Sequence, residues 1–420
     1  MIAPLRPRTK NALLTLLCVG MLSIYTARVA AIYFAQRLAD SSEGERRITD
    51  LERSIRLAPD DAEFPNLLGL RLSVSDQDDQ RAIANLQKAV VLNPNRGFYW
   101  LDLASVYQLT RNVDKENEAL QSAMNAEPLN PEISEEAAQI YLASGEPDRA
   151  FPLFKQTLEQ NPGAADTILP LCWRETRNAN LIFARVIPAI PRLQLAFLRL
   201  LTEQGESTAA SDVWQSIVAR HQSFQPQLGF FYFDYLLTDH DVAGFDRGWR
   251  ALADLAPEIR AYLPNQNLIV NAGFEQPLLN FGFDWRREPA DHITVGIDDK
   301  TAHSGTRSLS LSYDGNPAYD SGWKQLVPVE PDRDYDFSAW IKSENITSSS
   351  GPRFALVDAF SGANLLLTDD VLDTHPWQQI KGTLHIPSDT TLVAVRILRA
   401  PANTRIRGKV WIDDLRLVKE

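Results

Sequence analysis

Side chains that could carry acid–base, metal or nucleophilic chemistry are thinly spread over this sequence of 420 residues. The six histidines lie far apart, and the two cysteines, Cys18 and Cys172, show no zinc-ligand spacing and are too few for a disulfide framework. The densest polar cluster, at residues 234–241, could be imagined as a metal site, but LLTDHDVAGF is more typical of a turn between two helices. No nucleophile with a base, no carboxylate pair in a cleft and no phosphate loop is recognisable. The sequence therefore predicts a protein that is not an enzyme.

The charge distribution argues against nucleic acid as a partner. The net charge is −12 and uneven: residues 1–40 carry +4, residues 41–264 carry −11 and residues 265–420 carry −5. Nucleic acid selects basic surfaces, which the body of this chain does not offer. With 44% hydrophobic and 23% charged residues, the composition is that of ordinary folded protein, and the length predicts two or three domains.

Prolines recur with a nearly constant period along the first half of the chain. Pro59, Pro94, Pro128 and Pro162 are separated by 35, 34 and 34 residues. A period of 34 among short helical patterns predicts a solenoid of helix pairs, in which each proline ends a second helix. One pair cannot bury its own apolar face, but a stack of pairs can.

The residues between these prolines also repeat in kind. The predicted packing residues are Leu68, Gly69, Ala82, Leu86, Ala89, Trp100, Leu103, Ala104, Tyr107, Leu120, Ala123, Tyr141, Gly145, Ala150 and Phe154. Their order (a large residue, Leu-Gly/Ala, Tyr, then Ala, Phe/Leu, Ala and Pro) resembles that of tetratricopeptide repeats. The resemblance implies a scaffold that binds a protein partner, whose identity the sequence does not give.

The helical pattern continues more weakly beyond Pro162. Residues 164–192 hold three prolines, and repeat-like units return at 194–222 and 228–257. The aromatic run at 230–233 predicts a terminal helix buried against the next domain. The alternative is an exposed groove for a partner.

The N-terminus combines a short basic flank, residues 1–11, with a mostly apolar stretch at 12–34. Twenty-three residues can span a bilayer with some tilt, and Arg28 can extend its guanidinium towards the interface. The basic flank predicts a single-pass inner-membrane anchor with the N-terminus in the cytoplasm and the body outside it. The rival interpretation is a cleaved secretory signal with a small-residue site at 29–31. In both interpretations the rest of the protein is exported from the cytoplasm.

The pattern changes from helices to strands at Pro264. Short runs of alternating apolar residues, separated by turns, occur at 309–313, 335–341, 353–359, 377–386, 392–398 and 410–418. So many short strands predict an all-β sandwich or jelly roll.

The predicted organisation is thus a multidomain chain with an all-α and an all-β part. The predicted domains are a basic flank (1–11), a transmembrane anchor (12–34), a tetratricopeptide-like solenoid (35–263, with clear repeats at 63–162 and divergent ones at 164–263) and a β-sandwich (264–420).

Residues 267–420 resemble a known family. The order of NLIVNAGFEQP, Trp285, AHSGTRSLSLS, YDFSAWIKSE and a final WIDDLRL is similar to that of carbohydrate-binding modules of the family 4/9 type, which have a galactose-binding-like jelly roll. The resemblance implies a structural calcium ion near the first and last strands, with Glu275 and Asp413 as matching carboxylates, because oxygen ligands suit calcium. The alternative is that both acids only satisfy backbone groups at strand ends. No other cofactor is predicted.

Sugar binding by the sandwich would need aromatic rings and polar groups on one exposed face. In YDFSAWIKSE, alternation directs Trp340 and Lys342 towards one face of the strand. The residues expected to face the core are Tyr335, Phe337, Ala339 and Ile341. We expect Trp323, Gln325, Trp340 and Lys342 to form a glycan-binding surface.

These patterns predict a membrane-anchored, extracytoplasmic, non-catalytic scaffold of a bacterial envelope. Its solenoid binds a protein and its sandwich binds a polysaccharide, in a setting such as exopolysaccharide or O-antigen assembly or export. The alternative is a protein–protein adaptor in secretion or envelope-complex assembly with no sugar role.

Overall fold

The computed structural model of the protein describes residues 7–41, 46–75 and 78–420. Arg6 of the predicted basic flank and residues 42–45 lie outside the described residues. The chain forms two compact units, 1–188 and 189–420, which divide inside the predicted solenoid. The predicted domain boundaries stay predictions.

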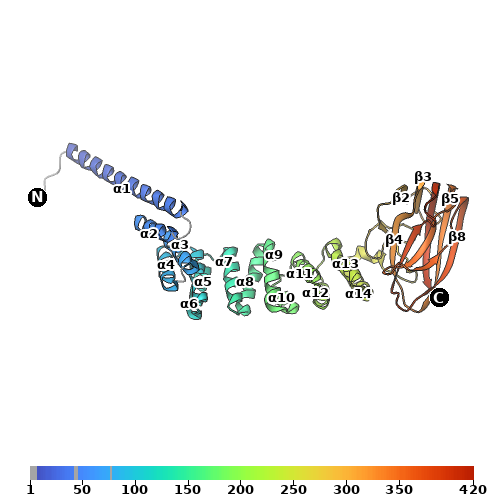
Figure 1. Ribbon diagram of the computed structural model, residues 1–420, viewed down its shortest axis with the longest axis horizontal. Helices are drawn as coiled ribbons and strands as arrows, with labels where there is room; N and C mark the ends of the chain where they lie inside the picture. The colour runs from blue at the N-terminus through green and yellow to red at the C-terminus, as the bar shows by residue number, and fades with distance from the viewer. Residues whose placement is uncertain (1–6, 42–45, 76–77) are drawn as a thin grey trace. The chain divides into compact units, whose positions relative to one another are not determined.

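The first unit consists of helices that follow one another in pairs (Figure 1). They are α1 (Pro7–Ser41), α2 (Arg46–Leu57), α3 (Glu63–Ser75), α4 (Asp79–Leu92), α5 (Gly97–Leu109), α6 (Val113–Ala126), α7 (Pro131–Ala143), α8 (Pro147–Gln160), the 3-10 helix η1 (Pro162–Ala164), α9 (Ala165–Thr176) and α10 (Ala179–Arg185).

Helix ends in this unit follow from short polar residues and prolines. The side chains of Asn112 and Asn130 accept hydrogen bonds from backbone N–H groups at the starts of α6 and α7. Pro131 occupies the first turn of α7, where no backbone donor is needed. Pro94 and Pro128 lie two residues beyond α4 and α6, where a helix cannot easily continue. The 34-residue period therefore corresponds to helix pairs α3–α4, α5–α6 and α7–α8.

Most of the predicted packing residues are buried between these helices, but two are not. Leu86, Ala104 and Phe154 have no exposed surface. Gly145 is exposed and has a φ of 79°, so the prediction that it packs is wrong: it ends α7 in a left-handed conformation that favours glycine. Trp100 is only half-buried, because its indole nitrogen turns outwards to donate to the Pro94 carbonyl at 2.9 Å.

Helix α1 is longer than the predicted transmembrane segment. Within the described residues, the stretch Leu16–Asp40 is the one long and apolar enough to cross a membrane, and a signal sequence near the N-terminus would share these properties. Ala35 and Ala39 in its last turns are buried, and Ser54 of α2 donates a 2.8 Å hydrogen bond to the Ala35 carbonyl. The C-terminal part of α1 is therefore the packing partner of α2.

The second unit begins with two further helix pairs. They are α11 (Pro191–Glu203), α12 (Ser207–Ala219), the 3-10 helix η2 (Pro226–Gly229), α13 (Phe230–Thr238), α14 (Val242–Leu255) and the 3-10 helix η3 (Pro257–Tyr262).

The aromatic run at the start of α13 is largely internal. Tyr232 and Phe233 are buried, and Phe230 stacks on Phe281, which follows η3 in the chain, with ring centroids 4.0 Å apart. The interpretation of a terminal helix packed on the next domain agrees with this contact, whereas the exposed-groove alternative does not.

Two antiparallel sheets form the rest of the unit (Figure 1). The strands are β1 (Arg286–Arg287), β2 (Ile293–Asp298), β3 (Ser308–Pro317), β4 (Asp320–Pro328), β5 (Arg333–Thr347), β6 (Arg353–Asp358), β7 (Asn364–Leu367), β8 (Asp373–Ile386), β9 (Leu392–Leu398) and β10 (Arg405–Lys419). One sheet has the order β1-β4-β9-β6-β7 and the other β2-β3-β10-β5-β8. The core lies between them and includes Phe337, Phe354 and Trp285. The predicted β-sandwich is confirmed.

Candidate functional site

The outward face of the β2-β3-β10-β5-β8 sheet carries the predicted Trp340 and Lys342. Tyr335, Phe337 and Ile341 alternate with them along β5 and are buried. Trp340 and Lys342 are each half-buried. The pleat of β5 thus sets the direction of both side chains, as its alternation predicts.

Neighbouring side chains cover much of Trp340. The imidazole of His303 stacks on its ring with centroids 3.9 Å apart and an angle of 16°, and Trp377 approaches His303 edge-on at 5.6 Å. Asp414 fixes the imidazole, because its Oδ2 lies 2.6 Å from His303 Nδ1. A sugar ring would have to displace His303 to stack on this face of Trp340.

Trp411 of β10, which the sequence analysis did not single out, lies next to Lys342 of β5. The Lys342 and Lys409 ammonium groups lie 5.1 and 4.5 Å from the centre of its ring. Its indole N–H donates to Asp298 at 2.8 Å, and this hydrogen bond is the main reason why the pKa of Asp298 lies well below its usual value. Trp411 is buried under the lysines, so it offers no free ring surface.

Trp323 and Gln325 do not belong to any exposed surface, and their predicted place beside Trp340 is wrong. Both point into the core from β4, where Trp323 is 2% exposed and Gln325 is 0% exposed. The Gln325 amide accepts from Val270 N at 3.1 Å and donates to Val270 O at 2.8 Å. Gln325 therefore holds the opening segment of the sandwich in place as a neighbouring strand would.

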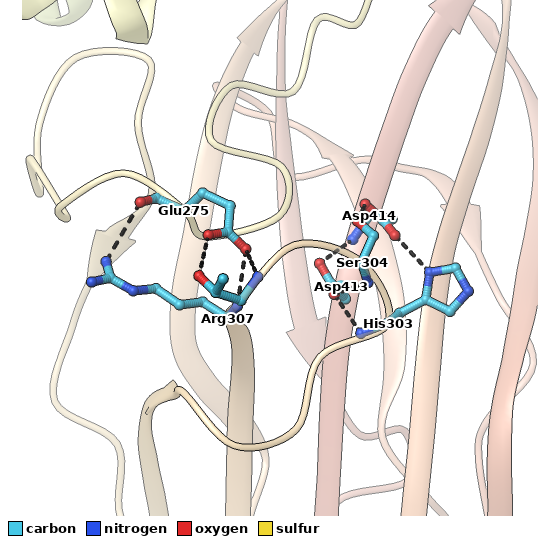
Figure 2. A network of polar contacts seen from close by, with 7 residues as sticks. Glu275, His303, Ser304, Arg307, Asp413 and Asp414 are labelled. Carbon is cyan, nitrogen blue, oxygen red and sulfur yellow. Dashed lines mark hydrogen bonds and ion pairs between the residues drawn. The ribbon is translucent and has the colours of Figure 1, made fainter.

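Glu275 and Asp413 are engaged with backbone N–H groups (Figure 2). Glu275 Oε1 accepts from the backbone of Thr306 and Arg307 at 2.7 and 2.9 Å, and the Thr306 hydroxyl donates to Oε2 at 2.7 Å. These bonds, with the Thr306 hydroxyl first, lower the pKa of Glu275. Asp413 Oδ2 accepts from the backbone of His303 and Ser304 at 2.7 and 3.1 Å.

These contacts bear on the implied calcium ion. Asp413 Oδ1 accepts from the Asp414 backbone N–H at 2.8 Å. With the bonds above, every carboxylate oxygen of Glu275 and Asp413 therefore accepts a hydrogen bond from an N–H or O–H group. Among the described residues, no group of three or more His, Cys, Asp or Glu side chains is arranged to hold a metal ion. The arrangement fits the alternative, in which both acids satisfy backbone groups. Calcium stays a prediction.

The outward face of the other sheet combines small apolar residues with cations. Lys324 of β4, Arg396 of β9 and Ala355 of β6 are direct cross-strand neighbours. Ala355 and Ala394, both outward, are nonetheless buried. Arg396 donates to Asp320 at 2.7 Å, so the cation and the carboxylate stand together beside an apolar floor.

Two further groups lie on β4 or directly before it. Tyr319 directly precedes β4 and is 56% exposed. Lys324 forms an ion pair with Glu288 at 2.5 Å, so this face has a second pair of donor and acceptor groups beside Arg396 and Asp320. Sequence reasoning missed this surface, because it did not recognise 320–328 as a strand and so did not assign its faces.

The polar cluster at 234–241 spans the end of α13 and the turn at 239–241 that joins it to α14, as predicted. Asp241 caps α14 by accepting from Gly244 N at 2.7 Å. His240 has a φ of 58° and stacks on Phe360 with centroids 4.0 Å apart. These contacts account for the side chains of Asp241 and His240.

Residues 266–402 match the family model described as a carbohydrate binding domain. The predicted resemblance to carbohydrate-binding modules is thereby confirmed, and the helical part of the chain has the predicted repeat-like helix pairs. Both are non-catalytic kinds of domain. The match covers about a third of the chain, so it describes the sandwich and not the whole protein.

Several solved structures are similar to parts of the chain. One is a CBM4 module, with 15% identity over 36% of this chain and 99% of that one and a TM-score of 0.28. The others are PilF of Pseudomonas aeruginosa (16% identity, 55% of this chain and 93% of that one, TM-score 0.29) and MamA (24%, 35% and 86%, 0.29). No match is found among curated proteins. Similarity at this level does not define a function.

Proposed function

We propose that the chain is a non-catalytic scaffold that binds a polysaccharide through its β-sandwich and a protein through its helix pairs. The observation that carries the glycan part is the match of residues 266–402 to a carbohydrate binding domain. Helix-pair arrays are a common protein-binding architecture, which supports the second part. The setting that suits both is assembly or export of a cell-envelope polysaccharide.

We place the glycan on the outward face of β4, β9 and β6. Pyranose rings have an apolar face and a rim of hydroxyl groups, so a binding surface needs an apolar floor beside paired donors and acceptors. Ala355 and Ala394 supply the floor, and Arg396 with Asp320 supplies the polar groups. On the opposite sheet the Trp340 ring is already covered by His303, which makes it the weaker candidate.

Replacing Arg396 by alanine is expected to weaken retention on polysaccharide gels by about tenfold, because a charged donor to a sugar hydroxyl is lost. Arg333→Ala is the matched control, since Arg333 is an exposed arginine that pairs with Glu330 at 3.8 Å. Affinity electrophoresis of the full chain on a panel of bacterial polysaccharides measures the effect.

The same gels compare the two faces of the sandwich. If Trp340→Ala abolishes retention while Arg396→Ala does not, the glycan binds on the β5 and β10 face that the sequence predicts. If the wild-type chain is retained on no glycan, the adaptor function replaces the scaffold function proposed here.

The N-terminal helix is proposed as an uncleaved inner-membrane anchor, with the body outside the cytoplasm. Its last turns pack on α2 through Ala35 and Ala39, so the apolar helix continues into the folded body without a break. Intact-mass measurement of the membrane-extracted protein is expected to give the full-length chain. A mature start near Ile32 would contradict the anchor but leave export standing.

A further inference from the structure

A pocket of about 310 Å³ lies between α12 and α14. Gly244, Gly248 and Ala251 line it from α14, on one face of that helix, and Trp214 and Val218 line it from α12. The small side chains of α14 leave the space that larger ones would fill. A volume of this size is at the lower end for ligand sites and suits one large side chain rather than a whole cofactor.

The indole N–H of Trp214 is an unsatisfied donor beside this space. Trp214 is 3% exposed, and its Nε1 has no hydrogen-bond partner within the described chain. A Cβ atom on Gly248 would lie 3.3 Å from this nitrogen, so the nitrogen faces the bare backbone of α14 that lines the pocket. The buried indoles of Trp285 and Trp411 donate to Asn271 O and Asp298, whereas that of Trp323, inside the sandwich core, also lacks a partner among the described residues.

The ring of Trp214 is held in this orientation. Tyr232 stacks on it with centroids 5.0 Å apart, and Phe233 meets it edge-on at 5.3 Å. The indole therefore cannot easily turn its N–H to another acceptor. Buried donors in folded proteins almost always have an acceptor, which makes this one a reason to look for a ligand.

A cation stands at the pocket as well. Arg247 lines it from α14 and is exposed, and no carboxylate of the described residues forms an ion pair with it. Arg250, one turn further along, is instead paired with Asp246 at 2.9 Å. The pocket thus offers an apolar space, a buried N–H donor and a free guanidinium.

We propose that this pocket binds a peptide segment of a partner protein that inserts one apolar side chain, with a carbonyl group accepting from Trp214 and a carboxylate pairing with Arg247. The inference rests on the protein-binding part of the proposed function and specifies the chemistry of the partner. It is independent of glycan binding by the sandwich.

N-acetyl-phenylalanine is a minimal probe, because it combines an apolar side chain, a carbonyl group and a carboxylate. The full chain in detergent is labelled with 5-fluorotryptophan, and Trp214→Phe assigns one of the nine tryptophan signals in fluorine NMR. The Trp214 signal is expected to shift and saturate with the probe. N-acetyl-phenylalaninamide, which lacks the carboxylate, is expected to bind about fivefold more weakly.

Variants separate the pocket from non-specific effects. Ala251→Leu fills the pocket and is expected to remove the shift while the helical circular dichroism stays unchanged. Arg247→Gln is expected to abolish the preference for the carboxylate, and Arg250→Gln to keep it. A Trp214 signal that stays unmoved throughout the titration of folded protein, or that moves equally in Ala251→Leu, would overturn the proposal.

Capture of proteins from solubilised membranes distinguishes this proposal from the broader function. If the wild type and Ala251→Leu capture the same partner equally, the pocket assignment fails and protein binding stands. If the wild type captures no partner, protein binding fails, and the fluorine titration still decides whether the pocket takes the probe.

Discussion

The Phe154→Ala variant is expected to lose about 3–5 kcal/mol of stability in the helical array. Phe154 on α8 is fully buried at the position where the second helix of a repeat packs on the first. Truncating a buried aromatic side chain removes its burial and leaves a cavity that the surrounding helices fill only in part. Because each helix pair depends on its neighbours, the loss is expected to spread to the adjoining repeats.

Urea denaturation followed by helical circular dichroism measures this change. Glu159→Ala is the matched control, because Glu159 is exposed on the same helix and its loss should change stability by less than about 0.5 kcal/mol. A loss below about 1 kcal/mol for Phe154→Ala would show that the repeat register is wrong.

Arg399→Met is expected to destabilise the sandwich by about 3 kcal/mol or more. Arg399 has no exposed surface, and its guanidinium donates to the carbonyl groups of Ser350, Ala318 and Thr404 at 2.9, 2.8 and 3.0 Å. It also donates to the hydroxyl groups of Ser348 and Thr404. Methionine fills a similar volume but leaves these buried acceptors without a donor.

Thermal unfolding followed by near-ultraviolet circular dichroism, to which the sandwich contributes five of the nine tryptophans, tests this expectation. Arg405→Met is the control, since Arg405 is exposed at the start of β10. Arg399→Lys should fall between the two, because one ammonium group cannot reach acceptors in three separate loops. Equal stability of Arg399→Met and wild type would mean that the cost of burying the guanidinium cancels its hydrogen bonds.

Periodicity carried the sequence predictions wherever it was strong. The spacing of the prolines predicted the helix pairs, and alternation along β5 predicted the directions of Phe337 and Trp340. Each element must turn its apolar residues towards a core, so the helical and strand periodicities can be recognised in the sequence.

Predictions failed where a local feature broke the pattern. Gly322, with a φ of 72°, interrupts β4 near a register shift, and Pro328 ends the strand, so the alternation that buries Trp323 and Gln325 was not recognised. The covering of Trp340 by His303 joins residues far apart in sequence, and no local signal encodes it. The pocket beside Trp214 likewise depends on which residues of α12 and α14 face each other.

If α1 is the proposed anchor, its continuity fixes how the helical array is rotated relative to the bilayer. The helix runs unbroken from Pro7 to Ser41, a length of about 52 Å, and its last turns belong to the packing with α2. In the proposed anchored state, one continuous helix contains both the lipid-facing segment and the turns that pack against the array. One residue inserted between Thr26 and Ala35 would turn the array by about 100° around the axis of α1 and move it by about 1.5 Å along that axis. In that proposed state, the number of residues in α1 determines the direction in which the array points away from the membrane.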